Sequence, residues 1–204
     1  MSNDSSSKKR IIKDSATYLS STILAQVLGL LRTLMIPILL GPTQLGVWNL
    51  MNVIVGYGAN AHLGILHGLN KKIPYLKGLG KIEEIDELKD SVFWVNLLLG
   101  ISTGAILFIV SFILDPLYAT ASRIIAVVIV LQIVWLFYFC MLRGDSHFNL
   151  VSKGITLLSF FSSTFIVFLA YIFTERLLGA LFGLIISYVI VIFYWVVKSN
   201  YRFA

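Results

Sequence analysis

The chain has 204 residues, of which 58% are hydrophobic and only 13% charged, and its mean hydropathy is +0.89. Soluble domains carry about 25% charged residues, so this composition excludes an ordinary soluble domain and is typical of a protein that crosses a membrane several times. The formal net charge is +6, but the basic residues fall between long uncharged runs. We therefore expect them to set the membrane topology, and we expect no nucleic-acid partner.

The first long uncharged stretch predicts two helices rather than one. Between Asp14 and Lys71 lie 56 residues with a single charged side chain, Arg32. One helix of that length would overshoot a bilayer about threefold, so the stretch must fold back once. The strong turn signal near its middle is Gly41-Pro42-Thr43-Gln44. It predicts two spanning helices, at residues 15–40 and 45–69.

Two polar segments flank this helix pair. Residues 1–13 form a basic tail on the cytoplasmic side, and we expect its polar first part to be disordered. The 70–90 segment places Ile82, Ile85 and Leu88 at helical spacing among acids and lysines, which predicts a short amphipathic helix on the cytoplasmic surface. Its acidic residues form either a solvated face or a patch that binds a protein.

Four further uncharged runs follow, each close to the roughly 20 residues that span a bilayer. They predict helices at 91–114, 123–142, 154–174 and 177–197. The predicted fold is therefore all-α and integral to the membrane, with six transmembrane helices in residues 14–204. Small residues at four-residue spacing, in Gly100-xxx-Gly104 and Gly179-xxx-Gly183, predict close packing between helices.

The distribution of basic residues predicts the orientation of these helices. With six crossings, thirteen lysines and arginines lie on the side of the two termini, whereas the opposite side has only Arg123 and Arg176. Cytoplasmic segments carry the excess of basic residues. Both termini are therefore predicted to be cytoplasmic.

The first predicted helix has a polar face of about 120° that includes Arg32. A charged residue at mid-bilayer depth costs at least about 2.5 kcal/mol when it faces lipid, so Arg32 should face a partner or a watery cavity. A guanidinium can hold phosphate through two hydrogen bonds, but interhelical hydrogen bonding or snorkelling explains an arginine there equally well. The face consists of Ser15, Tyr18, Thr22, Gln26, Gly29, Arg32 and Thr33.

The second predicted helix carries a similar polar stripe. Three asparagines in one spanning helix are costly unless they bind a ligand or line water, although bonding between helices is an equal alternative. From the two faces we select as cavity candidates Thr22, Gln26, Arg32, Asn49, Asn52, Asn60 and His67. The sequence has no metal-ligand spacing and no nucleotide or nucleophile motif, so we expect no enzyme, no metal and no cofactor.

Several short motifs resemble the polysaccharide transport proteins, which are oligosaccharide flippases of the multidrug/oligosaccharidyl-lipid/polysaccharide exporter superfamily. The resemblance covers nearly the whole chain from about residue 12 and corresponds to the N-terminal half of that family. The matching residues are Gly29 and Arg32 in the first helix, Leu40, Gly41, Pro42, Gly46 and Trp48 at the turn, Pro74, Tyr75, Gly78 and Gly80 after the second helix, and Arg143-Gly144 after the fourth.

The resemblance implies one lobe of a two-lobe fold with 12 to 14 helices around a central cavity. It implies an undecaprenyl-pyrophosphate-linked oligosaccharide as substrate, flipped across the plasma (inner) membrane of a bacterium or archaeon during synthesis of O-antigen lipopolysaccharide, capsule or exopolysaccharide. Arg32 would meet the pyrophosphate. The chain holds only one lobe, so the resemblance also implies a fragment, a truncated product, or a half-transporter that pairs with a second copy or another chain.

Two alternatives stay open from the sequence. One is a drug or cation antiporter of the same superfamily, which the lack of an acidic residue deep in any predicted helix disfavours. The other is a membrane scaffold or fragment that transports nothing.

Overall fold

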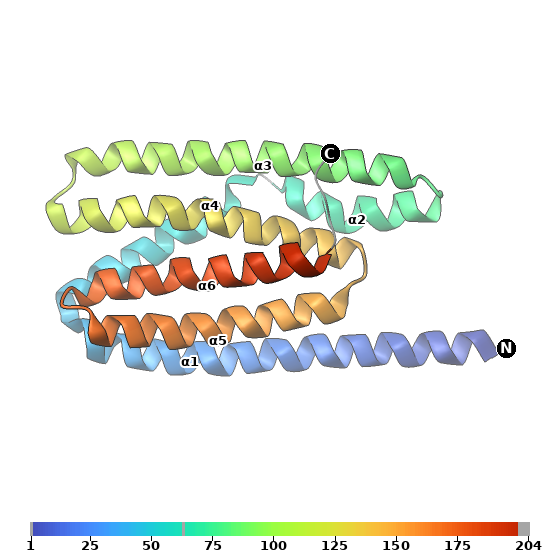
Figure 1. Ribbon diagram of the computed structural model, residues 1–204, viewed down its shortest axis with the longest axis horizontal. Coiled ribbons are helices and arrows are strands. Elements are labelled where there is room, and N and C mark those ends of the chain that lie inside the picture. Colours follow the sequence, from blue (N-terminus) through green and yellow to red (C-terminus); the bar gives the residue numbers. More distant parts are fainter. Residues whose placement is uncertain (1, 63, 200–204) are drawn as a thin grey trace.

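The protein is all-α in the part that the computed structural model describes, which is the backbone of residues 2–62 and 64–199 and the side chains of residues 15–60, 62 and 64–199. The chain packs as a bundle of long helices (Figure 1). Its elements are α1 (Ser2–Ala59), η1 (Asn60–His62), α2 (Ile65–Gly78), α3 (Ile82–Val110), η2 (Ser111–Ile113), α4 (Pro116–Gly144), α5 (Phe148–Ile172) and α6 (Arg176–Ser199).

Five stretches of these residues are long and apolar enough to cross a membrane, so the chain is a multi-pass helical membrane protein. They are Ser15–Ala59, Ile82–Ile113, Pro116–Gly144, Phe148–Ile172 and Arg176–Ser199.

The first of these stretches is broken at Gly41, where the sequence predicts a turn. Gly41 has φ 67° and ψ 175°, a left-handed conformation that glycine adopts without the steric cost of a Cβ. Pro42 follows as the first residue of the next helical part, where its missing N–H leaves no bond unmade. The chain changes direction there (Figure 1), and the parts on either side, 15–40 and 42–59, are each about long enough to span a bilayer.

The second predicted helix differs from the structure. It was expected to run unbroken over 45–69, but α1 ends at Ala59 and α2 begins only at Ile65. Gly64 lies between them with φ 81°, and its N–H donates to Nδ1 of His62 over 2.9 Å. The left-handed Gly64 is the N-cap residue of α2 and so marks the start of that helix. An isolated glycine in an apolar run does not by itself predict such a turn.

The predicted surface helix in the 70–90 segment is also not found. The segment contains the last turns of α2, a short turn at residues 79–81, and the first turns of α3. Ile73 and Leu76 of α2 are buried in one cluster with Ile85 of α3. These residues pack against each other and against α4 instead of lying on a lipid surface, so α2 and the start of α3 form a helical hairpin.

Three of the later helices start well before the predicted positions, whereas α3 ends at Val110 and α5 at Ile172, short of the predicted residues 114 and 174. α3 begins nine residues before the predicted residue 91, α4 begins at Pro116, and α5 begins at Phe148. Charged residues such as Arg123 and Lys153 therefore lie inside helices, because a helix continues past the bilayer core into the polar surroundings. The backbone of residues 2–13 likewise continues α1 as a helix, where the composition predicted a disordered first part.

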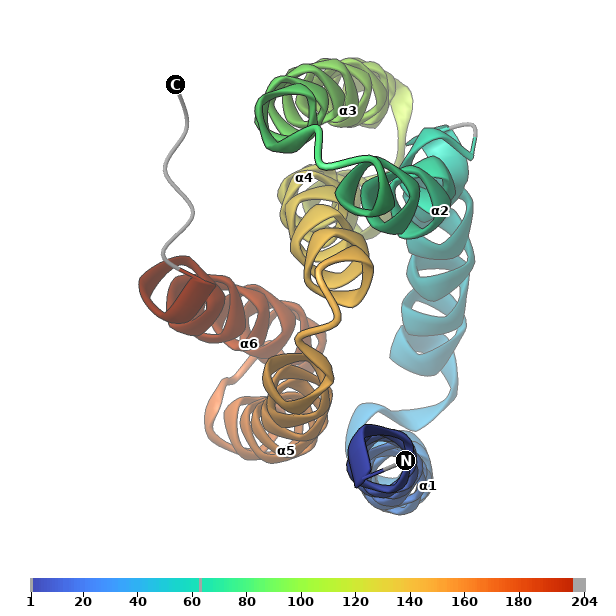
Figure 2. The same cartoon turned by 90° about the vertical axis from the view of Figure 1, so that its right-hand side faces the viewer.

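The predicted glycine contacts are confirmed. A Cβ on Gly183 would lie 2.7 Å from the backbone of Ile166 in α5, and one on Gly104 would lie 2.9 Å from the carbonyl oxygen of Ala126 in α4. Side chains larger than hydrogen would push these helices apart. Figure 2 shows the resulting pairs, α5 against α6 and α3 against α4.

The bundle has two distinct ends (Figure 1). We call the end with Gly41 and the turns at residues 111–115 and 173–175 the Gly41 end. We call the end with the turns at 79–81 and 145–147 the Asp145 end. α1 begins and α6 finishes at the Asp145 end.

Candidate functional site: an arginine between polar cavities

The site centres on Arg32, which α1 holds against α5. The Nη1 of Arg32 donates a hydrogen bond to the hydroxyl oxygen of Ser162 over 3.0 Å. Ser162 is only 5% exposed, and its own hydroxyl donates to the carbonyl oxygen of Ser159. Its neighbour Ser163 donates to the carbonyl oxygen of Leu28 over 2.9 Å. These bonds hold α1 alongside α5 at the level of the arginine.

The guanidinium of Arg32 is half-buried and has no ion-pair partner among the side chains that the structure describes. An arginine offers five N–H donors, and Ser162 accepts from one nitrogen only. Arg32 lies nine residues from Gly41, which is roughly 14 Å along the helix and close to half of a bilayer core of about 30 Å. At this depth the charge needs a polar partner.

One cavity beside Arg32 lies inside the bundle. It measures about 340 Å³ and is bounded by both parts of α1 and by α4, α5 and α6. Figure 2 shows these helices end-on. The cavity has a polar lining made of Arg32, Asn52, Gln132, Ser159, Ser162 and Tyr188.

A second cavity, also about 340 Å³, opens on the other side of Arg32, between the two parts of α1. Thr33, Asn49 and Asn52 supply polar groups to its lining. The amide nitrogen of Asn52 donates to the carbonyl oxygen of Trp48 over 2.7 Å. Arg32 and Asn52 border both cavities, so a ligand with several polar groups could contact both spaces at once.

The structure brings together three of the seven predicted residues, Arg32, Asn49 and Asn52. The hydroxyl of Thr22 donates to the carbonyl oxygen of Tyr18, and the amide of Asn60 donates to that of Gly56. Neither these residues nor Gln26 and His67 line the two cavities around Arg32.

The break after Ala59 separates His67 from the predicted stripe, and its ring lies edge-on to His62 with centroids 5.1 Å apart. Thr22 and Gln26 lie about two to three turns away from Arg32 toward the Asp145 end. A shared helix face therefore does not place all of these residues at one depth.

Four polar residues that line the interior cavity were not selected from the sequence, namely Gln132, Ser159, Ser162 and Tyr188. The Oε1 atom of Gln132 is buried and has no hydrogen-bond partner among the described residues. Ser162 and Tyr188 come from helices with no deep charge, and nothing in their local sequence separates them from packing residues. A glutamine inside an apolar run was the one available signal, because its amide is costly to bury unpaired.

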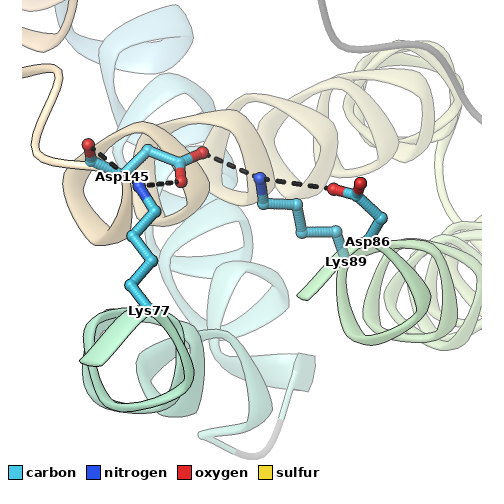
Figure 3. Close-up of polar contacts among 4 residues, drawn as sticks. All are labelled: Lys77, Asp86, Lys89 and Asp145. Atoms are coloured by element: carbon cyan, nitrogen blue, oxygen red, sulfur yellow. Dashed lines mark hydrogen bonds and ion pairs between the residues drawn. The ribbon is translucent and has the colours of Figure 1, made fainter. Parts of the chain in front are cut away.

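A second charged centre lies at the Asp145 end (Figure 3). Lys77 of α2 and Lys89 of α3 approach opposite oxygens of the Asp145 carboxylate, with N–O distances of 2.7 Å and 2.9 Å. Asp86 lies 3.9 Å from the Lys89 nitrogen. Lys89 is only 7% exposed. The cluster ties the α2–α3 hairpin to the turn between α4 and α5.

The two lysines stabilise the charged form of Asp145. Burial alone would raise the pKa of this carboxyl group, but the hydrogen bonds and charges of Lys77 and Lys89 outweigh that effect and lower the pKa below its ordinary value. The centre is therefore an internally neutralised structural cluster. Among the described residues, no group of three or more His, Cys, Asp or Glu side chains could hold a metal ion.

Comparison of the chain with protein-family models, with curated proteins and with solved structures finds no match. Fold alone does not assign a function, so the functional argument rests on the Arg32 site.

Proposed function

We propose that this chain is one lobe of a flippase that moves a lipid-linked oligosaccharide with a phosphate or pyrophosphate linkage across the plasma membrane. The observation that carries the proposal is the guanidinium of Arg32, which lies between two polar cavities and has no ion-pair partner among the described side chains. Phosphate suits this group because a guanidinium can bind two of its oxygens at once.

The lining of the cavities supports a sugar as the other part of the ligand. Asn49, Asn52 and Gln132 present amides, and Ser159 and Tyr188 present hydroxyls. Such groups both donate and accept, as sugar hydroxyls do. The free oxygen of Gln132 would gain a donor when a sugar binds.

The exposed polar residues of α1 support a second lobe as partner. Gln26, Thr33 and Asn49 are exposed on a membrane-spanning element, and polar side chains facing lipid are unfavourable. A second copy, another chain or a further part of this protein would cover them and close the cavity, and rocking of the two lobes would then alternate access to Arg32.

The proposed topology has six crossings, because the break at Gly41 divides Ser15–Ala59 into two spanning segments. The Asp145 end has the lysine-rich segments and would be cytoplasmic. Proton- or cation-coupled antiport is less favoured, because residues 15–70 and 91–114 contain no Asp or Glu and neither do the cores of the later helices.

The experiment is a leaflet-exposure assay in proteoliposomes with a labelled lipid-linked oligosaccharide. We expect transport by the assembled protein, and a loss of at least about tenfold in Arg32→Gln, since a hydrogen-bonded charge contributes about 1.5–3 kcal/mol. The matched control is Arg123→Gln, because Arg123 lies near the Gly41 end against Phe112 and outside both cavities. Full transport by Arg32→Gln, or none by any assembly of the wild type, would contradict the proposal. The second result would favour a scaffold.

A further inference from the structure

A third space borders Arg32, on the outer face where α1 packs against α5. It is a groove of about 520 Å³ with an almost wholly apolar lining. α1 contributes Leu31, Met35 and Ile38, and α5 contributes Val167, Phe168 and Tyr171. The α1 residues follow one another at steps of four and three, and on α5 Val167 and Phe168 lie four and three residues before Tyr171, so each helix presents one apolar row.

The groove runs lengthwise from Arg32 toward the Gly41 end. On α1 it extends from Arg32 to Leu39, about 10 Å along the helix axis. On α5 it extends from Ser163 to Tyr171, toward the same end of the bundle. Phe168 is 54% exposed and Tyr171 is 76% exposed, so the groove opens to the hydrocarbon region of the membrane.

Among the residues that the structure describes, Arg32 alone lines this groove and both polar cavities. The groove therefore has a cation without a carboxylate partner at its inner end and apolar side chains along its length. A neutral hydrocarbon would contact only the apolar rows of α1 and α5, and a free phosphate would bind only the guanidinium of Arg32. A lipid with a phosphate at the head of a long hydrocarbon chain matches both.

We propose that the α1–α5 groove binds the hydrocarbon chain of a phosphate-bearing lipid while Arg32 binds its phosphate. This inference rests on the proposed function and adds to it the path of the lipid chain. The polar head would reach the interior cavity at Arg32, which lines both the groove and that cavity.

The direction of the groove assigns an orientation to the bound lipid. The chain points toward the Gly41 end, and the interior cavity extends from Arg32 toward the Asp145 end at Gly56 and Ser159. With the Asp145 end cytoplasmic, the head of this lipid points toward the cytoplasm, as in the cytoplasmic leaflet, while its phosphate lies near mid-bilayer depth at Arg32. The groove is then a loading site occupied before the lipid turns over.

The experiment is photocrosslinking of the full chain in nanodiscs with two probes that have the same long polyprenyl chain and a photoreactive group within it. One probe ends in a phosphate and the other in an alcohol. We expect the phosphate probe to label residues 31–39 and 163–171 by mass spectrometry, at least about tenfold more than the alcohol probe. Arg32→Gln should bring the two probes to the same low level.

A groove-filling variant tests the apolar part separately. Val167→Trp places a large ring in the groove, whereas the matched control Val189→Trp places one on α6, at an exposed position outside this groove. We expect labelling to fall in the first and not in the second. Equal labelling by both probes, unchanged labelling in Arg32→Gln or in Val167→Trp, or competition by an equal concentration of inorganic phosphate would overturn the inference.

The two proposals fail in distinguishable ways, because labelling does not require transport. If groove residues are labelled but no assembly of the protein flips the lipid, the flippase proposal is contradicted and the lipid-binding site is still supported. The opposite result would be flipping that depends on Arg32, that Val167→Trp does not reduce, and that comes with no labelled residue in the groove. It would contradict the proposed path of the lipid chain and would still support the flippase.

Discussion

Arg32 and Lys89 are both basic side chains that are at least partly buried, but they differ in whether a carboxylate lies beside them. Lys89 lies 2.9 Å from the carboxylate of Asp145 and within 3.9 Å of Asp86. Arg32 has a neutral hydroxyl as its hydrogen-bond partner and three cavities around it. The cluster at the Asp145 end has its charges satisfied within the protein and links elements together. The arginine near mid-depth is left available, as expected of a group that serves a ligand.

The largest effect on stability is expected from Asp145→Ala. This change leaves Lys77 and Lys89 without the carboxylate between them, and an uncompensated buried charge typically costs 3–5 kcal/mol. We expect the free energy of unfolding to fall by about 3 kcal/mol, measured by denaturant titration in micelles. The control Asp86→Ala, at a carboxylate that is 67% exposed, should change it by less than about 1 kcal/mol. Equal effects of the two variants would mean that Asp145 does not hold the cluster.

A smaller effect is expected when both buried partners are removed. In the double variant Asp145→Ala with Lys89→Met the buried lysine charge is gone, and Lys77 can reach water because its side chain is 45% exposed. We expect the double variant to be more stable than Asp145→Ala by about 1–2 kcal/mol. Strictly additive losses in the double-mutant cycle would show that the pair is not coupled.

The smallest effect is expected from pH. The pKa of Asp145 is lowered in the folded protein, so its ion pairs contribute stability above the unfolded-state pKa of about 3.9, and this contribution is lost as pH falls through the folded pKa. The stability difference between wild type and Asp145→Asn should therefore shrink as pH falls from about 6 to about 3. A difference that stays constant across that window would contradict the assigned ion pairs.

The long uncharged runs of the sequence predict the membrane-spanning helices, and Gly41 and Pro42 predict the break in the first of them. The sequence also predicts the helix contacts at Gly104 and Gly183, because small residues at fixed spacing are a local signal. The prediction failed between Ala59 and Ile65, where α1 ends and Gly64 precedes the start of α2 inside an apolar run, and in the 70–90 segment, where Ile85 packs into a helical hairpin.

The site was only partly predictable for a different reason. Arg32 is conspicuous because it is a lone charge in an uncharged stretch. Its partner Ser162 is 130 residues away, and Asp145 is 56 residues from Lys89. Such contacts depend on how the helices assemble, and the periodicity of a single helix does not contain that information. Depth along the bundle likewise separates Thr22 and Gln26 from the cavities around Arg32.

The central claim is that Arg32 is kept unpaired for a phosphate-bearing lipid, and the melting temperature tests it most directly. The measurement compares wild type and Arg32→Gln in micelles, with and without a long-chain polyprenyl phosphate. Without lipid, the variant should be as stable as wild type or more stable, because it loses an unpaired charge and no ion pair. The lipid should raise the melting temperature of wild type and leave that of the variant unchanged. A variant that is less stable without lipid, and that the lipid still stabilises as much as wild type, would contradict the account.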